Sequence, residues 1–168
     1  SLIPLIALAI YNRQNVAVKG DKLIETALRE NSDMIKKHIR TQLKNNPGRD
    51  ILTASEKAKN ELGLSFTIYQ GSKMVYTTNS DLRKATVISD IINPQAYNSL
   101  VFKGVNEEVI NDSFEGISYK TYVNRTKISN SIYFIEVNNL FNVIHNPFSA
   151  IEIDVFLFGT YSLGIILI

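Results

Sequence analysis

Apolar residues recur at helical spacing over the first third of the chain. Between Arg13 and Asn45, aliphatic side chains fall at intervals of four and seven, and polar residues fill the positions between them. This pattern predicts one long amphipathic helix that ends at the Pro47-Gly48 pair. We expect its apolar stripe to pack on the domain's own sheet or to act as a dimer and signalling helix by pairing with a second copy. The stripe consists of Ile24, Leu28, Ile35, Ile39 and Leu43.

A second, shorter helix is predicted over residues 54–62. The sequence from Thr53 to Glu56 fits a capping box, and Gly63 is a typical stop. The period then changes to two. Residues 64–70 and 73–78 alternate on either side of a Gly-Ser turn, which predicts a β-hairpin.

The rest of the domain reads as one more helix and three more strands. Pro94 opens a short helix that reaches about Phe102, before a glycine. Strand patterns follow over residues 107–114, 117–123 and 132–138. Short connections between consecutive strands require antiparallel pairing. The sequence therefore predicts an α+β fold, with a long N-terminal helix and short covering helices on one side of a five-stranded antiparallel sheet.

Both ends of the sequence are apolar. Residues 1–10 and 155–168 carry no charge, although a membrane span needs roughly 20 residues. A core helix at each end is the alternative, but the second run lacks the polar stripe of a globular helix. We expect the end of a transmembrane helix at 1–11, an extracytoplasmic domain at 12–148, and the start of a second transmembrane helix at 149–168.

Composition argues against several kinds of site. The net charge of +2 is too small to indicate nucleic-acid binding, and the absence of cysteine excludes thiolate metal sites and thiol nucleophiles. His38 and His145 have no partners at metal-ligand spacing. The neighbouring acids Glu107 and Glu108 point to opposite faces of a strand. We therefore expect no catalytic site, no metal and no cofactor in this chain.

Several short runs resemble the extracytoplasmic sensor domain of membrane histidine kinases of the nitrogen-regulation type, which is a PAS-like domain of the single-Cache kind. The resemblance covers roughly residues 64–168 and implies a PAS-like sheet. One departure is Asn124, close to where such domains often carry proline after the second tyrosine, so the end of that strand is left open. The runs are residues 66–69, 75–79, 92–97, 115–122, 135–138 and 146–148, together with Gly71.

The resemblance also implies a ligand pocket between the concave face of the sheet and its cover of helices and loops. Tyrosines offer such a pocket contact area and a polar group, and an arginine can hold a carboxylate. An organic anion is therefore the expected ligand. The alternative is that these residues belong to an ordinary core and rim. The candidates are Tyr76, Thr78, Arg83, Tyr97, Tyr119 and Thr121.

Taken together, we expect a signal-sensing domain in the cell inner membrane. It would belong to a two-component sensor histidine kinase, form a homodimer through the long helix, and relay changes through the second transmembrane helix. The alternatives are the ectodomain of a chemoreceptor or cyclase-linked receptor, and a membrane-tethered domain that binds a partner without signalling.

Overall fold

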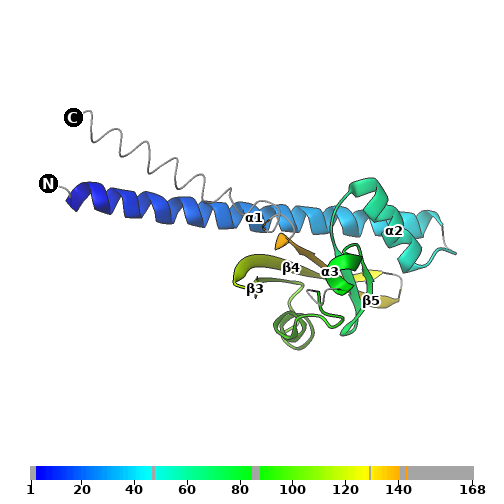
Figure 1. The fold of residues 1–168 in the computed structure, drawn as a ribbon. Coiled ribbons are helices and arrows are strands. Elements are labelled where there is room, and N and C mark those ends of the chain that lie inside the picture. Colours follow the sequence, from blue (N-terminus) through cyan, green and yellow to red (C-terminus); the bar gives the residue numbers. More distant parts are fainter. Residues whose placement is uncertain (1–2, 47, 85–87, 129, 141–142, 144–168) are drawn as a thin grey trace.

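The computed structural model describes residues 3–46, 48–84, 88–128, 130–140 and 143 (Figure 1). The expected second membrane segment at 149–168 lies outside these residues, as does His145. Of the expected first segment, the backbone is described from Ile3. Within the described part of the chain, no helix contains an apolar stretch long enough to cross a membrane.

A single helix, α1, runs without a break from Ile3 to Asn45. It therefore starts ten residues earlier than the amphipathic pattern alone predicts. At 1.5 Å per residue its 43 residues extend about 65 Å. Figure 1 shows that the C-terminal half of α1 lies along the sheet, whereas the N-terminal half projects beyond it.

The second helix, α2 (Ile51–Leu62), begins earlier than predicted because its cap is a different residue. The Asp50 carboxylate accepts a hydrogen bond from the backbone N–H of Thr53 at 2.8 Å, so the predicted capping box from Thr53 is wrong. The predicted stop is confirmed. Gly63 has a φ of +64°, a left-handed conformation that glycine adopts without strain.

Five antiparallel strands form one sheet in the order β2-β1-β5-β4-β3. This confirms the α+β class and the five-stranded antiparallel sheet. β4 is longer than predicted and passes through Asn124, because it pairs with β5 as far as Ile128 opposite Ser131. The strands are β1 (Thr67–Gln70), β2 (Lys73–Thr77), β3 (Glu107–Phe114), β4 (Ile117–Ile128) and β5 (Ser131–Asn138).

Helices cover both faces of the sheet, so the prediction of helices on one side is wrong. One buried cluster joins α1 and α2 to the first face. The second cluster joins the opposite face to α4 (Pro94–Tyr97) and to η1 (Asn98–Phe102), a π-helical turn that follows it directly. We call α4 and η1 together the cover. A further short helix, α3 (Ser80–Lys84), follows β2.

The apolar stripe of α1 packs on the domain's own sheet. Leu28, Ile35 and Ile39 are buried in the first cluster, and Ile24 and Leu43 pack against it. Of the two interpretations of this stripe, the structure therefore supports packing within the domain. A dimer through α1 requires another face of the helix.

Polar side chains tie α1 to the strands, and three of these ties are 3.0 Å or shorter. The Lys120 ammonium contacts Glu25 at 3.0 Å, and the Arg40 guanidinium donates to the Thr126 hydroxyl at 2.7 Å. Arg29 pairs with Glu107 at 2.6 Å. A shift of α1 along its axis would strain all three ties together.

Candidate functional site

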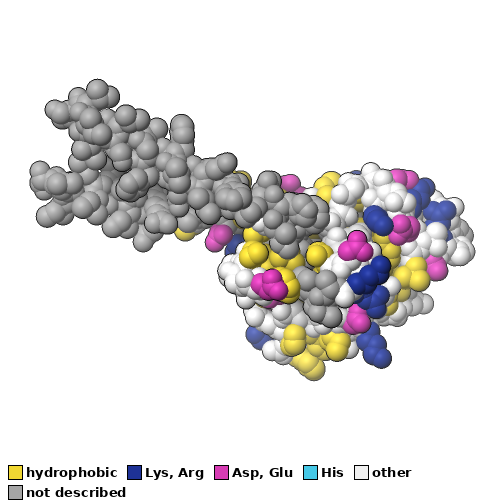
Figure 2. All heavy atoms as spheres, viewed as in Figure 1, with side chains coloured by type: hydrophobic (Ala, Val, Ile, Leu, Met, Phe, Trp, Pro, Cys, Tyr) yellow, Lys and Arg dark blue, Asp and Glu magenta, His cyan; other side chains and the backbone are white. Residues whose placement is uncertain are grey.

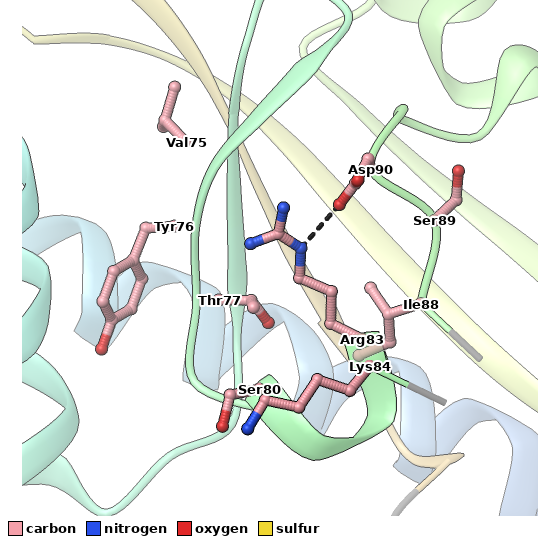
Figure 3. Close-up of a pocket in the computed structure, with 9 residues that line it drawn as sticks. All are labelled: Val75, Tyr76, Thr77, Ser80, Arg83, Lys84, Ile88, Ser89 and Asp90. Atoms are coloured by element: carbon pink, nitrogen blue, oxygen red, sulfur yellow. Dashed lines mark hydrogen bonds and ion pairs between the residues drawn. The ribbon is translucent and has the colours of Figure 1, made fainter. Parts of the chain in front are cut away.

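A hollow of about 630 Å³ lies between β2, α3 and the segment before α4 (Figure 3). This volume falls within the roughly 300–1,000 Å³ of sites that hold small molecules. Its walls combine two cations, an acid and several hydroxyl groups with aliphatic side chains. The lining residues are Val75, Tyr76, Thr77, Ser80, Arg83, Lys84, Ile88, Ser89 and Asp90.

An ion pair crosses the hollow. The Nε atom of Arg83 contacts Oδ1 of Asp90 at 2.6 Å, and both side chains are more than half exposed. The hydrogen bond to Asp90 raises the pKa of Arg83, so the guanidinium stays charged. Figure 3 shows its two terminal nitrogens turned toward the β2 side of the hollow. In this position they can bind a second acceptor, such as the carboxylate of a ligand.

Tyr76 lines the same hollow, but its polar end points away from it (Figure 3). The hydroxyl donates to the Glu56 carboxylate on α2 at 2.8 Å. Burial is the largest cause of the raised pKa of Tyr76, and this hydrogen bond is a smaller one. Thr78 does not line the hollow, because its hydroxyl accepts from the backbone N–H of Phe66 at 2.9 Å and closes the hairpin.

The other three predicted site residues lie where the cover meets the sheet, Tyr97 in the cover and Tyr119 and Thr121 in β4. Tyr97 packs edge-on against Phe134 with ring centroids 6.0 Å apart. Thr121 is buried in β4. Tyr119, two residues before it, is half-buried, and burial together with the nearby Asp112 charge raises the pKa of this tyrosine to about 12. The predicted site is therefore divided between the hollow and the covered face.

A polar group that the sequence reasoning missed occupies the covered face. Glu136 in β5 is only 8% exposed. The polar side chains of Tyr69 in β1 and Asn138 in β5 act on its carboxyl group and lower its pKa. Burial raises the pKa of Glu136 to about 7, and the negative charge of Asp112 adds a smaller effect in the same direction. This carboxyl group can therefore gain or lose a proton near neutral pH.

A signal for this group was present in the sequence. Glu136 sits between Ile135 and Val137 in a strand that is otherwise apolar at its centre. On a sheet covered on one side only, alternation would place this glutamate in water. Because both faces are covered, the same alternation buries it.

The described residues contain no cluster of His, Asp or Glu side chains placed to hold a metal ion. His38 of α1 instead lies 3.1 Å from the Glu61 carboxylate of α2. Comparison of the sequence with known family models and with curated proteins finds no match to either.

Proposed function

We propose that this chain is the sensing domain of a membrane receptor, anchored through the apolar start of α1 and related to the PAS-like sensors of histidine kinases. The observation that carries the proposal is α1 itself. One unbroken helix connects an uncharged segment at its start to the core of the sheet. A rigid element of this kind is suited to transmit a displacement between a membrane and a domain.

The architecture supports the same proposal. A long N-terminal helix, a five-stranded antiparallel sheet and short covering helices are what the resemblance to single-Cache sensors implies. The ties of Glu25, Arg29 and Arg40 to the sheet give a change in the domain a route to α1. A ligand acts through such a route only if it binds two arrangements with different affinity.

The hollow at Arg83 is the proposed ligand site. Its guanidinium recognises a carboxylate, the hydroxyl groups of Thr77, Ser80 and Ser89 accept or donate hydrogen bonds, and Val75 and Ile88 contact a short aliphatic part. The chemical class that fits is a small organic acid with hydroxyl or amino substituents. Such a ligand would bind the terminal nitrogens of Arg83 while Nε stays paired with Asp90, which would join the ligand to the segment before α4.

Arg83→Ala is expected to abolish ligand-induced stabilisation. The test uses the 168-residue chain in lipid nanodiscs and measures Tm with a panel of small carboxylic and amino acids. A ligand at 100 times its Kd stabilises by about 2.7 kcal/mol. At least one acid should raise the Tm of the native chain, and the same acid should leave Arg83→Ala unchanged.

The matched control is Lys103→Ala, which removes an exposed cation outside the hollow. This variant should respond to the acid like the native chain. An equal loss of response in both variants would mean that net charge, and not the hollow, attracts the ligand. A response that survives in Arg83→Ala would move the ligand site elsewhere.

A homodimer through α1 is part of the proposal. The face of α1 opposite the buried stripe carries Leu23 and Met34, which are 71% and 47% exposed. They are eleven positions apart, about three helical turns, so they lie on one face. Exposed apolar side chains in this alignment suit a partner helix of the same kind.

A cysteine scan tests the dimer, because the native chain contains no cysteine to interfere. Leu23→Cys in nanodiscs should form a covalent dimer under mild oxidation. Lys22→Cys, about 100° round the helix, is the control and should crosslink much less. Equal crosslinking at both positions, or none at Leu23→Cys, would exclude this face as the interface.

One observation favours the alternative of partner binding. The outer side of the cover and the loop after it expose Val101, Phe102 and Val105, and Phe102 is 75% exposed. Figure 2 shows apolar side chains, in yellow, gathered at the lower tip of the domain. A domain that binds a protein through this apolar tip needs no small ligand. If no acid in the panel raises the Tm of the native chain, this alternative is preferred over the hollow.

A further inference from the structure

Glu136 is the one charged side chain among the buried residues that the structure describes. It lies in β5, which pairs with β1 on one side and β4 on the other, so it sits within the sheet and not at an edge. Its neighbours Ile135 and Val137 belong to the cluster under α1, whereas Phe134 belongs to the cluster under the cover. By strand alternation, Glu136 therefore faces the cover.

In the part of the chain that the structure describes, polar side chains and acids act on Glu136, and no cation is paired with it. Tyr69 and Asn138 are the polar side chains that act on its carboxyl group and lower its pKa, whereas the charge of Asp112 raises it. Arg125 also belongs to this face of β4, but its guanidinium donates to the Leu100 carbonyl of the cover at 3.2 Å. The remaining titratable groups facing this region are Tyr119 of β4, Tyr97 of the cover, and Asp90, whose charge acts on Tyr69. Glu108 of β3 also belongs to this face, because it pairs with Val123, which in turn pairs with Glu136.

Neighbouring polar side chains connect this region to the start of the cover. Tyr119 lies opposite Asp112 of β3, and the charge of Asp112 acts on it. Asp112 accepts from the side-chain amide of Asn93 at 3.4 Å. Asn93 is the N-cap of α4, and its side chain accepts from the backbone N–H of Gln95 at 2.9 Å. A change of charge on the covered face can therefore act, through Asp112, on Asn93, the residue that caps α4.

We propose that Glu136 makes this domain responsive to protons: the protonated carboxyl group keeps the cover packed on the sheet, and loss of the proton loosens the cover. An ionised carboxylate in an apolar surrounding must be hydrated or paired with a cation. α1 closes the other face of the sheet, so water reaches Glu136 most directly through the cover. The raised pKa of about 7 agrees with this arrangement. The proposal is independent of the hollow at Arg83.

The sign of the pH effect follows from linkage. Because the pKa of Glu136 is higher in the folded protein than its usual 4.5, the folded state holds a proton that the unfolded chain has already lost. The stabilising contribution is complete below pH 4.5 and disappears as the pH rises to about 7. Across this window the unfolding constant should increase by up to about tenfold per pH unit.

The first experiment measures the titration directly, by NMR of the 168-residue chain labelled with ¹³C at glutamate carboxyl groups. One signal should titrate near pH 7 and should be missing in Glu136→Gln. Glu108→Gln, another strand glutamate, is the control and should retain it. If no glutamate signal of the native chain titrates above pH 5.5, the proposal is wrong. This outcome is read from the native chain and does not depend on whether Glu136→Gln folds.

The second experiment measures what the proton does. Urea unfolding of the native chain from pH 5 to 8 should show the loss of stability described above, and Glu136→Gln should show a flatter profile. Hydrogen exchange of the Tyr97 amide, which donates to the Asn93 carbonyl at 3.0 Å, reports on the cover. The protection factor of this amide, corrected for intrinsic exchange, should fall above pH 7 in the native chain. It should not fall in Glu136→Gln. Equal protection at pH 5.5 and 8 would overturn the coupling to the cover.

Discussion

Ile39→Ala is expected to lower the free energy of unfolding by about 2–5 kcal/mol. The side chain is fully buried between α1, α2 and the sheet, where Ala54, Ala58 and Ile135 belong to the same cluster. Truncation removes apolar contacts and leaves a cavity that a rigid helix cannot close. Domains of this size are stable by only about 5–15 kcal/mol, so the loss is a large fraction of the total.

Urea unfolding followed by circular dichroism measures the change. Lys22→Ala is the matched control, because Lys22 is exposed on the same helix and lies off the face proposed for the dimer. Substitutions at such surface positions usually change stability by less than about 0.5 kcal/mol. A similar loss in both variants would mean that the apolar stripe of α1 does not rest on the sheet as described.

Phe134→Ala is expected to lower the free energy of unfolding by about 3–5 kcal/mol. Its effect falls on the face of the sheet that packs against the cover. Phe134 is buried in the cluster that holds the cover, and its ring packs against Tyr97 at 6.0 Å. Without the ring, α4 and η1 lose their main aromatic contact with β5. Hydrogen exchange of the cover should increase more than exchange in α1.

Ile132→Ala in the same strand is the control, because Ile132 is 41% exposed. It should leave both the stability and the exchange of the cover nearly unchanged. Because Ile39 and Phe134 lie in different clusters, the double variant should lose about the sum of the two single losses, within about 0.5 kcal/mol. A clear departure from additivity would show that the two faces are coupled through the sheet.

The secondary structure was largely predictable because each element carries its own local pattern. The period of α1, the glycine after α2, the hairpin turn and the limits of β3 all follow from short-range sequence. The end of β4 did not, because residues 124–128 become a strand only by pairing with β5. The local alternation of polar and apolar residues does not predict which distant strand a segment pairs with.

The coverage of the sheet was the main error, and it decided what could be predicted of the site. An apolar strand face looks the same whether a helix or a loop covers it. The cover is only nine residues long in two short pieces, Pro94–Tyr97 and Asn98–Phe102, too short for a helical stripe to reveal which face it packs on. Glu136 was missed for this reason.

The candidate ligand residues show the same limit. The guanidinium chemistry of Arg83 makes it a candidate for binding an acid, and Arg83 does line a hollow together with Tyr76. Which way a side chain points depends on its partners, however, and the Tyr76 hydroxyl turns to Glu56 on α2. A partner twenty positions away in the sequence cannot be identified from the spacing of residues in one strand.

The strand order has a consequence for how the domain folds. β1 and β5 lie side by side in the sheet, yet the whole segment from β2 to β4 separates them along the chain. Contacts between distant segments slow folding, because a large loop must close before they form. During synthesis the edge of β1 that later pairs with β5 therefore stays unpaired until β5 has left the ribosome.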